Sequence, residues 1–414
     1  MFRQGVFLAF QVMLAVSLAG PTGERIVYPR LREGRGLNGE KMLYVQDGLT
    51  LSLLKSRVFA ENFVLTVDDG LTQTDKIMRG EDLGNNLYHG NQGTAALQVE
   101  DANGTVQVTG FLEHTLAIEP LPLIARSGDG RIAHKLSEID YEAEARPPPP
   151  SYPPPAPPSD FVDVALLEMP SALKSDDSSP NVVLQRVKKV PEEFVVETRI
   201  ISDHHMNKGK TEKELIDYYG VRMNLVNHHF KQVTEPRVKF LTVGIVLSKK
   251  EPYARVVQDT KKNRTSSLLY DTLKHLVDTL NRTGQHKKQD AVVFNTGLVP
   301  ATTQRNGTIY YGVIGIAPMV GGVCSMYGVT TLALEGRNPM KSSRLIGHEL
   351  AHVVGVTHEG GGRKGRRCPK EGDGYLMGAR GPKAFSKCSI EQIRRRASTL
   401  SEECFQLTAG PIEI

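Results

Sequence analysis

The sequence predicts an α/β fold for its C-terminal half, and three observations lead to this prediction. Strand-like and helix-like stretches alternate from about residue 194 onward, a pattern typical of α/β domains. The chain has 414 residues, which is enough for two domains that each bury a core. Its 39% hydrophobic and 23% charged residues are typical of a globular protein rather than of a fibre or a disordered tail.

The expected strands are rich in β-branched residues, and the expected helices have apolar residues at helical spacing. Strands are predicted at 194–202, 238–247, 291–294 and 310–317. A further stretch, 321–329, is predicted as an edge strand able to bind an extended peptide. Helices are predicted at 212–219 (continuing toward residue 229), at 266–280, at 343–356, and at 389–400 with Ser389 as its N-cap.

A proline-rich run divides the chain. Residues 147–158 read PPPPSYPPPAPP, which cannot form helix or sheet and favours an extended spacer; a proline-rich motif that binds a partner is the alternative. We therefore predict an N-terminal domain over 20–146, a linker and processing region over 147–191, and a C-terminal domain over 192–414. Residues 190–414 carry 33 basic and 22 acidic side chains, and residues 1–189 carry 18 and 24. Because the net charges are opposite, the two halves are expected to attract each other.

The N-terminus indicates export. Arg3 precedes an apolar run over 6–18, and small residues follow at 17 and 19, so residues 1–19 are predicted to be a signal peptide. No later segment approaches the roughly 20 apolar residues of a membrane span, so no membrane anchor is expected. Nucleic-acid binding, which the pI of 8.8 alone would suggest, is not expected of a secreted protein. Four sequons are predicted glycan sites in surface loops, at Asn103, Asn263, Asn281 and Asn306.

All four cysteines lie in the last quarter of the chain: Cys324, Cys368, Cys388 and Cys404. In an oxidising compartment an even number predicts two disulfides, for which spacing leaves three connectivities open. A four-cysteine zinc site is disfavoured because no CxxC spacing is present. The histidine pairs at 204–205 and 228–229 are expected to be surface or locally hydrogen-bonded residues rather than second metal sites.

Residues 348–358, HELAHVVGVTH, have the spacing of a metal site. His348 and His352 lie four residues apart, so on a helix they share one face and can bind one Zn²⁺. Glycine tolerates positive φ, so the helix can end near Gly355 and the chain can turn sharply. His358 would then return as the third ligand and leave the fourth position open for water.

Glu349 follows the first ligand and is placed to accept a proton from the water and pass it to a leaving amine. Zinc would polarise the substrate carbonyl and lower the pKa of that water. Met377, nineteen residues after His358, is predicted to form a buried apolar floor under the site. We therefore expect a zinc-dependent endopeptidase. The alternative is a catalytically silent homologue that acts as a secreted binding protein, against which the intact Glu349 argues.

Residues 348–358 together with Met377 resemble the metzincin metalloproteases. The segments 322–325 (GVCS) and 385–389 (FSKCS) and the final Cys404 resemble the reprolysin (adamalysin) branch. The N-terminal half is similar to the pro-regions of this branch, particularly those of tick salivary metalloproteases, at 87–89 (LYH), 104–120 and 127–139 (SGDGRIAHKLSEI).

This resemblance implies a mixed five-stranded sheet above a zinc cleft, preceded by a mainly β prodomain. It implies the pairings Cys324–Cys404 and Cys368–Cys388, a monomeric zymogen, and protein substrates such as fibrinogen, fibrin or gelatin. A bound Ca²⁺ is left open, because no contiguous acidic loop specifies one. Two features depart from the family pattern. Glu359 stands where reprolysins usually have Asp, and the N-terminal half has no cysteine with which to hold the zinc.

Overall fold

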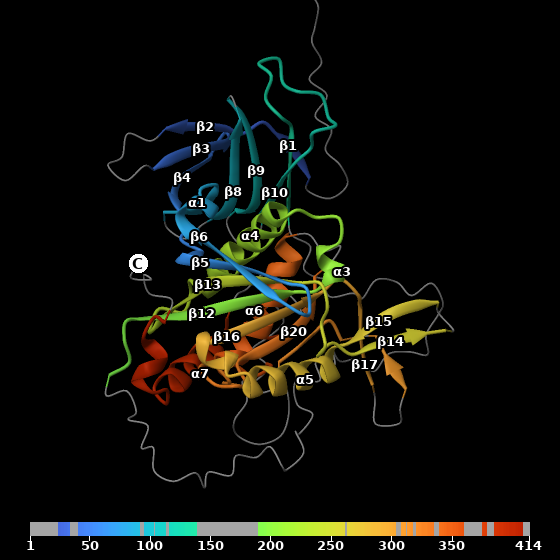
Figure 1. Cartoon of the computed structure of the whole chain (residues 1–414). Helices are drawn as coiled ribbons and strands as arrows, with labels where there is room; N and C mark the ends of the chain where they lie inside the picture. Colours follow the sequence, from blue (N-terminus) through green and yellow to red (C-terminus); the bar gives the residue numbers. More distant parts are fainter. Residues whose placement is uncertain are drawn as a thin grey trace, which may run out of the picture.

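A seven-stranded mixed sheet forms the centre of the computed structural model (Figure 1), which describes residues 24–33, 40–91, 95–102, 104–112, 116–138, 189–260, 263–303, 308–311, 313–317, 320–334, 339–359, 375–378 and 385–408. The strand order is β19-β20-β16-β12-β13-β5-β6. Neighbours are parallel except for the antiparallel pairs β19/β20 and β5/β6 at the two edges. The strands are β5 (Phe59–Asp68), β6 (Gln73–Arg79), β12 (Glu193–Ser202), β13 (Arg237–Ser248), β16 (Ala291–Thr296), β19 (Gly315–Ile316) and β20 (Val329–Ala333).

The sheet has seven strands, whereas the resemblance implies five for the C-terminal domain. Five come from the C-terminal half, and the hairpin β5–β6 is added from the N-terminal half. β5 runs parallel to β13, with Leu65 opposite Ile245, and both side chains are fully buried. The hairpin therefore pairs with β13, which would otherwise be an edge strand, and it extends the hydrophobic core across the predicted domain boundary.

The rest of the N-terminal half is mainly β-structure. Nine antiparallel strands form one sheet in the order β1-β11-β10-β9-β8-β7-β4-β3-β2, and the single-turn helix α1 (Gly80–Leu83) joins β6 to β7. The strands are β1 (Arg25–Val27), β2 (Arg30–Glu33), β3 (Lys41–Gln46), β4 (Leu49–Lys55), β7 (Leu87–Gly90), β8 (Ala95–Ala102), β9 (Thr105–Leu112), β10 (Leu116–Pro120) and β11 (His134–Glu138).

Helices cover both faces of the seven-stranded sheet. The helices are α3 (His204–Asn207), α4 (Glu212–Phe230), α5 (Leu269–Arg282), α6 (Pro339–Val353) and α7 (Lys387–Ala397), with 3-10 turns at Gln285–Lys288 and Glu402–Phe405. Successive side chains of a strand point to opposite faces of the sheet. Ile200 and Val293 accordingly lie in the core that contains α4 and α6, while Ile201 and Phe294 lie in the core of α5. In Figure 1, α4 lies between the two large sheets and α5 on the far side of the seven-stranded one. No helix in the described part of the chain is long and apolar enough to cross a membrane.

Most predicted elements of the C-terminal half are confirmed, with four local differences. The single strand predicted at 310–317 is wrong: the two short strands β18 (Ile309–Tyr310) and β19 stand there, and they belong to different sheets. The predicted edge strand at 321–329 is wrong: residues 321–327 form turns, and β19 is the edge strand instead. Helix α5 begins at Leu269, because 264–268 form β15 of a small third sheet. Helix α7 begins at Lys387 with Ser386 as N-cap, whose side chain accepts a hydrogen bond from the Ser389 N–H. The third sheet contains β14 (Val256–Asp259), β15 (Arg264–Leu268), β17 (Val299–Thr303) and β18 (Ile309–Tyr310).

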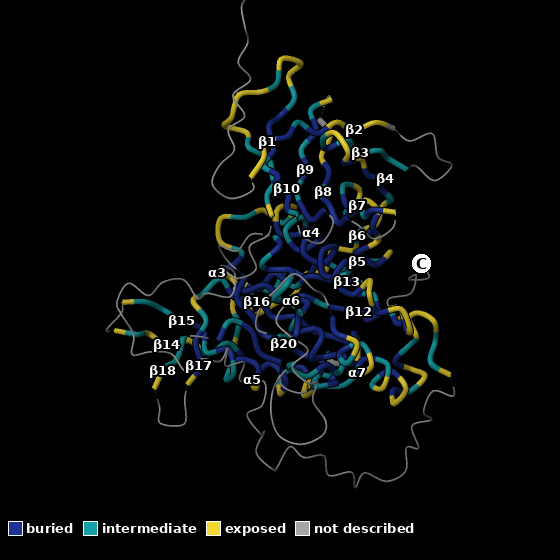
Figure 2. The backbone as a smooth tube through the Cα atoms, turned by 180° about the vertical axis from the view of Figure 1, so that it is seen from behind, coloured by how far each residue is buried: buried dark blue, intermediate teal, exposed yellow. Residues whose placement is uncertain are grey.

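One continuous core joins the two halves of the chain. Phe59, Phe63 and Phe111 belong to the same buried cluster as the side chains of α4, and Figure 2 shows buried residues continuing from β8 and β9 through α4 to β13. The Asn224 side-chain amide donates to the carbonyl of Tyr88 at 3.0 Å, which ties α4 to β7. Each half therefore needs the other to complete its buried surface.

The histidine pair at 228–229 lies in this junction, so of the two predicted alternatives, surface or locally hydrogen-bonded residues, the surface one is wrong for it. Both rings are buried in the described structure and contact the ring of Phe111 on β9. α4 is buried on most sides because sheets cover it above and below, and polar side chains in its last turn are enclosed with it.

Two of the predicted glycan sites are described. Asn263 is exposed in the turn between β14 and β15. Asn281 is also exposed, but it lies in the last turn of α5 rather than in a loop. Asn103 and Asn306 lie outside the described residues, as do the predicted signal peptide and most of the predicted linker.

Candidate metal centre

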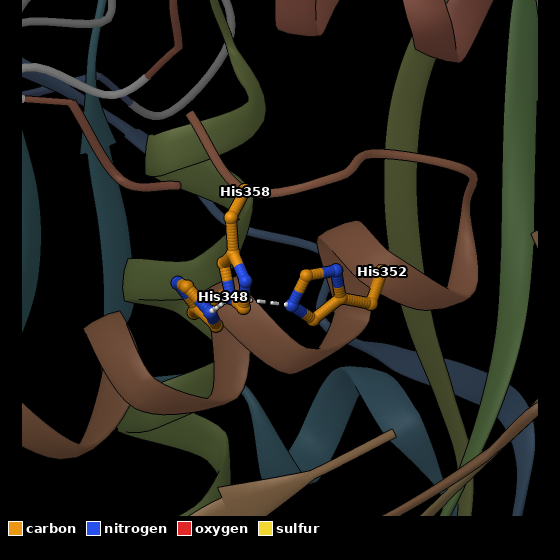
Figure 3. Close-up of side chains that lie close together, drawn as sticks. All are labelled: His348, His352 and His358. Carbon is orange, nitrogen blue, oxygen red and sulfur yellow. Dashed lines mark hydrogen bonds between the residues drawn. The ribbon is translucent and has the colours of Figure 1, made fainter. Parts of the chain in front are cut away.

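Helix α6 carries the first two histidines of the motif. It begins at Pro339, because proline suits the first turn of a helix, where backbone N–H groups have no partner within the helix. Ile346, Leu350 and Val353 bury its other face in the core. His348 and His352 therefore project together from the face opposite that core, as Figure 3 shows.

The end of α6 sends the chain back toward these histidines. Gly355 has φ of 107°, and a Cβ there would come within 2.7 Å of Cβ of Arg396, so glycine is required on two grounds. The carbonyl of His352 accepts the N–H of Gly321 at 2.7 Å, and that of Val353 accepts the N–H of Val323 at 3.0 Å. The segment predicted as an edge strand thus caps the helix end, and His358 returns over α6.

The three rings present converging nitrogen atoms. The Nε2 of His358 lies 3.0 Å from that of His348 and 3.1 Å from that of His352 (Figure 3). On the other side of two rings, Nδ1 faces a carbonyl, that of Leu376 for His348 at 2.8 Å and that of Val356 for His352 at 2.7 Å. Each Nδ1 must be the protonated nitrogen in order to donate to its carbonyl, which leaves an Nε2 lone pair aimed at the centre. Converging lone pairs of three imidazoles fit a tetrahedral Zn²⁺ with one position left open.

Glu349 lies in α6 with only 2% of its surface exposed, and its side chain extends to the edge strand β19. A Cβ added to Gly315 of β19 would overlap Oε1 of Glu349 and lie 2.9 Å from its Cδ. The glycine therefore leaves the space in which the carboxylate sits. Gly315 was not singled out from the sequence, because a two-residue strand has too little pattern to place it.

The turn that contains Met377 closes the site on another side. The Gly378 N–H donates to the carbonyl of Tyr375 at 3.0 Å, and the Met377 side chain is 1% exposed. The same turn supplies the Leu376 carbonyl that orients His348. Its Met377 carbonyl accepts the N–H of Glu359 at 3.0 Å, which anchors the residue after the third histidine.

Helix α7 holds the segment that carries His358. The Ser389 hydroxyl donates to Oε1 of Glu359 at 3.2 Å, so the longer acid that departs from the family pattern reaches a partner on α7. Oε1 of Gln392 accepts the Thr357 N–H at 2.9 Å, and Nε2 of Gln392 donates to the Thr357 hydroxyl at 3.0 Å. No local sequence signal points to Ser389 and Gln392, because each lies 30 or more residues from His358, the ligand that it helps to position.

A second group of ligand-type atoms lies apart from the histidines. Cys324 and Cys404 form a disulfide with Cα atoms 5.6 Å apart, and Asp290 lies beside it. The pKa of Asp290 is raised to about 7, mainly by burial and also by the charge of the nearby Glu197 carboxylate, while the hydrogen bond from the Glu197 N–H lowers it. Cys388 is also disulfide-bonded; its expected partner Cys368 lies outside the described residues.

Comparison with known proteins shows the family to which the chain belongs. Residues 196–408 match the family of reprolysin (M12B) zinc metalloproteases. The chain belongs to the reprolysin family. It is accordingly a zinc metalloendopeptidase, a hydrolase whose substrates are proteins, as the histidine motif predicts.

Its relatives include whole-length matches at low identity. The reprolysin is 23% identical over 404 residues to the venom metalloproteinase BumaMPs1 of Olivierus martensii, covering 95% of this chain and 94% of the relative. It is 22% identical over 418 residues to the venom metalloproteinase antarease TserMP_A of Tityus serrulatus, covering 96% and 97%. A solved structure, metalloproteinase-II from Bacteroides fragilis, is similar at 12% identity with a TM-score of 0.35, covering 90% of this chain and 91% of its own. The similarity to tick salivary enzymes stays a prediction.

Proposed function

We propose that this reprolysin is a secreted endopeptidase in which His348, His352 and His358 bind the zinc and Glu349 is the general base. The observation that supports this most is the convergence of three Nε2 atoms, two of which belong to rings whose Nδ1 is held by a carbonyl, those of His348 and His352. When bound there, zinc supplies a Lewis acid that polarises the scissile carbonyl and acidifies water.

The remaining chemistry belongs to the side chains of the chain itself. Glu349 follows a ligand on α6, and its carboxylate is held beside the edge strand. We assign it the proton that the attacking water gives up, which it later donates to the leaving amine nitrogen. The carbonyl of Leu376, in the turn that contains Met377, keeps the His348 ring in place during these transfers.

An extended substrate has a natural place along β19. This strand ends the sheet order, so one of its edges faces away from β20. A peptide that pairs with such an edge gains main-chain hydrogen bonds without requiring particular side chains. Because Gly315 of β19 contacts Glu349, a peptide docked there would bring its scissile bond next to the base.

The N-terminal sequence and the relatives support secretion. Residues 1–19 have the pattern of a signal peptide, and the relatives are venom metalloproteinases. We further assign residues 20–146 as a prodomain, 147–191 as the linker and processing region, and 192–414 as the catalytic domain. Extracellular or plasma proteins such as fibrinogen, fibrin or gelatin are the proposed substrates.

The test uses the whole chain, expressed through a secretory pathway so that disulfides form. Digestion of gelatin and fibrinogen is followed before and after limited proteolysis of the 139–188 region. We expect cleavage that a chelator abolishes and that added Zn²⁺ restores. The matched variant Glu349→Gln should bind one zinc per chain and lose at least about 10³-fold in rate.

Two outcomes would contradict the proposal. Cleavage by Glu349→Gln at the native rate would remove Glu349 from its assigned role. No cleavage by any zinc-loaded form, intact or processed, would favour the alternative of a catalytically silent binding protein.

A further inference from the structure

A cavity of about 460 Å³ opens where the N-terminal and C-terminal halves meet. The N-terminal half contributes Lys55 at the end of β4 and residues 56–58 after it, together with His89 and Ala96. The C-terminal half contributes Glu193, the last turns of α4 and the start of β13. Buried apolar side chains line it from both halves: Val58, Ala96, Phe230, Val233 and Val238. The cavity is separate from the metal centre, since it shares none of the histidine-site residues.

The charged side chains around this cavity are almost all basic. Five cations face one carboxylate, that of Glu193; the cations are Lys55, Arg57, Lys231, Arg237 and Lys239. Among the described residues, none of the five forms an ion pair with a carboxylate. Lys55 instead donates to the carbonyl of Asn85 and lies over the ring of Tyr88, 4.9 Å from its centroid. Like charges from both halves thus lie around the cavity; Lys239 is half-buried, and the other four are exposed to solvent, which screens part of their repulsion.

The titration of the lining groups agrees with this crowding. Burial lowers the pKa of Lys231 and of Lys239, and Arg57 lowers that of Lys239 further, against the attraction of Glu193. Burial, and then the charges of Lys231 and Lys239, lower the pKa of His89 to about 4. At neutral pH His89 is therefore uncharged, with Nδ1 3.1 Å from the Ser56 hydroxyl, and it can offer a hydrogen bond without adding to the repulsion.

We propose that this cavity is a binding site for an oxyanion, a sulfate or phosphate group, that joins the two halves of the chain. Basic side chains from both halves can contact one such group, and each contact is stronger than a neutral hydrogen bond. The apolar lining leaves space for the body of a larger molecule that carries the group. The site stands independently of the proposed catalytic function.

The direct test is thermal unfolding of the full chain in millimolar sulfate, phosphate or chloride at equal ionic strength. We expect sulfate or phosphate to raise the Tm by at least about 2 °C over chloride, because a ligand of the folded state stabilises it. Lys239→Gln and Arg57→Gln should each lose more than half of this increase. Lys274→Gln, which removes an exposed cation from α5 outside the cavity, should keep all of it.

A second readout separates a binding role from a structural one. Because the cations repel one another when no anion is bound, Lys239→Gln should raise the Tm in chloride while losing the response to sulfate. A merely structural lysine would lower the Tm and leave the response unchanged. General exclusion of sulfate from protein surfaces acts on all variants alike, so only the difference between variants reports the site.

The source of the oxyanion is distinguished by comparing inorganic sulfate with a sulfated disaccharide in titration calorimetry. At least tenfold tighter binding of the disaccharide would identify a sulfated glycan, and equal or weaker binding would identify the free ion. Equal Tm increases for the native chain, Lys239→Gln and Arg57→Gln would overturn the proposal. So would the absence of any heat of binding for both inorganic sulfate and the sulfated disaccharide.

Discussion

The described part of the chain contains two clusters of ligand-type side chains, and one of them has the chemistry of a metal site. His348, His352 and His358 bring three nitrogens within 4.8 Å, and so do Asp290, Cys324 and Cys404 with an oxygen and two sulfurs. In the first cluster the tautomers leave lone pairs aimed at one point. In the second, the sulfurs are joined to each other and no thiolate remains. Donor proximity alone therefore does not define a metal centre; the protonation and oxidation states of the donors decide.

The largest expected effect is the loss of zinc when a residue of the histidine cluster is replaced. His352→Ala should lose the zinc and at least about 10³-fold of the peptidase rate, because two ligands do not hold the ion. Zinc per chain and cleavage of a fluorogenic peptide measure this. His205→Ala, outside both clusters, is the control and should retain both. Full zinc content in His352→Ala would mean that other residues complete the site.

A smaller effect tests the position of the general base rather than the metal. Gly315→Ala places a Cβ where the Glu349 carboxylate lies, so kcat should fall about 10- to 100-fold with zinc content unchanged. Gly128→Ala is a suitable control, since a Cβ there meets nothing within 4 Å. An unchanged kcat in Gly315→Ala would show that the carboxylate does not act from its place beside β19.

The disulfide cluster should influence stability instead of metal binding. Cys324 and Cys404 are separated by 80 residues, so closing this loop restricts the unfolded chain considerably. Replacing both with serine should lower the free energy of unfolding by about 4 kcal/mol in urea titrations, with zinc retained under native conditions. Loss of zinc from the folded double variant would instead show that the two clusters depend on each other.

The smallest effect is a pH dependence from Asp290. Its pKa is raised to about 7, so between about pH 4 and pH 7 the folded chain keeps a proton that the unfolded chain releases. The free energy of unfolding contributed by this group is therefore fully present at low pH and falls as the pH rises through that window. Asp290→Asn should remove this loss. Its free energy of unfolding should therefore exceed that of the native chain by about 1–2 kcal/mol between pH 5 and pH 8. Parallel pH profiles for both proteins would contradict the assignment.

The two clusters also differ in how far the sequence predicts them. The histidine centre lies in eleven consecutive residues, so helical periodicity and one glycine are enough to predict its geometry. Gly315, Ser389 and Gln392 are not predictable in this way, because each acts across a tertiary contact.

Long-range pairing limits the prediction of the fold for the same reason. The strands at 193–202 and 237–248 follow from their β-branched residues, but nothing local to β5 shows that it pairs with β13. The opposite net charges of the two halves suggest attraction, whereas the cavity between them collects cations from both. Net charge describes the whole surface of a half and not the part that is in contact.

The pairing of β5 with β13 has a consequence for handling the protein. Without residues 59–79, the backbone N–H and C=O groups in the 242–248 part of β13 would lose their partners on one side. Such an edge is a template on which other chains add strands, and it is the usual start of aggregation. A preparation of residues 190–414 alone is therefore expected to self-associate, whereas a chain cut in the processing region should stay soluble as long as the hairpin remains paired with β13.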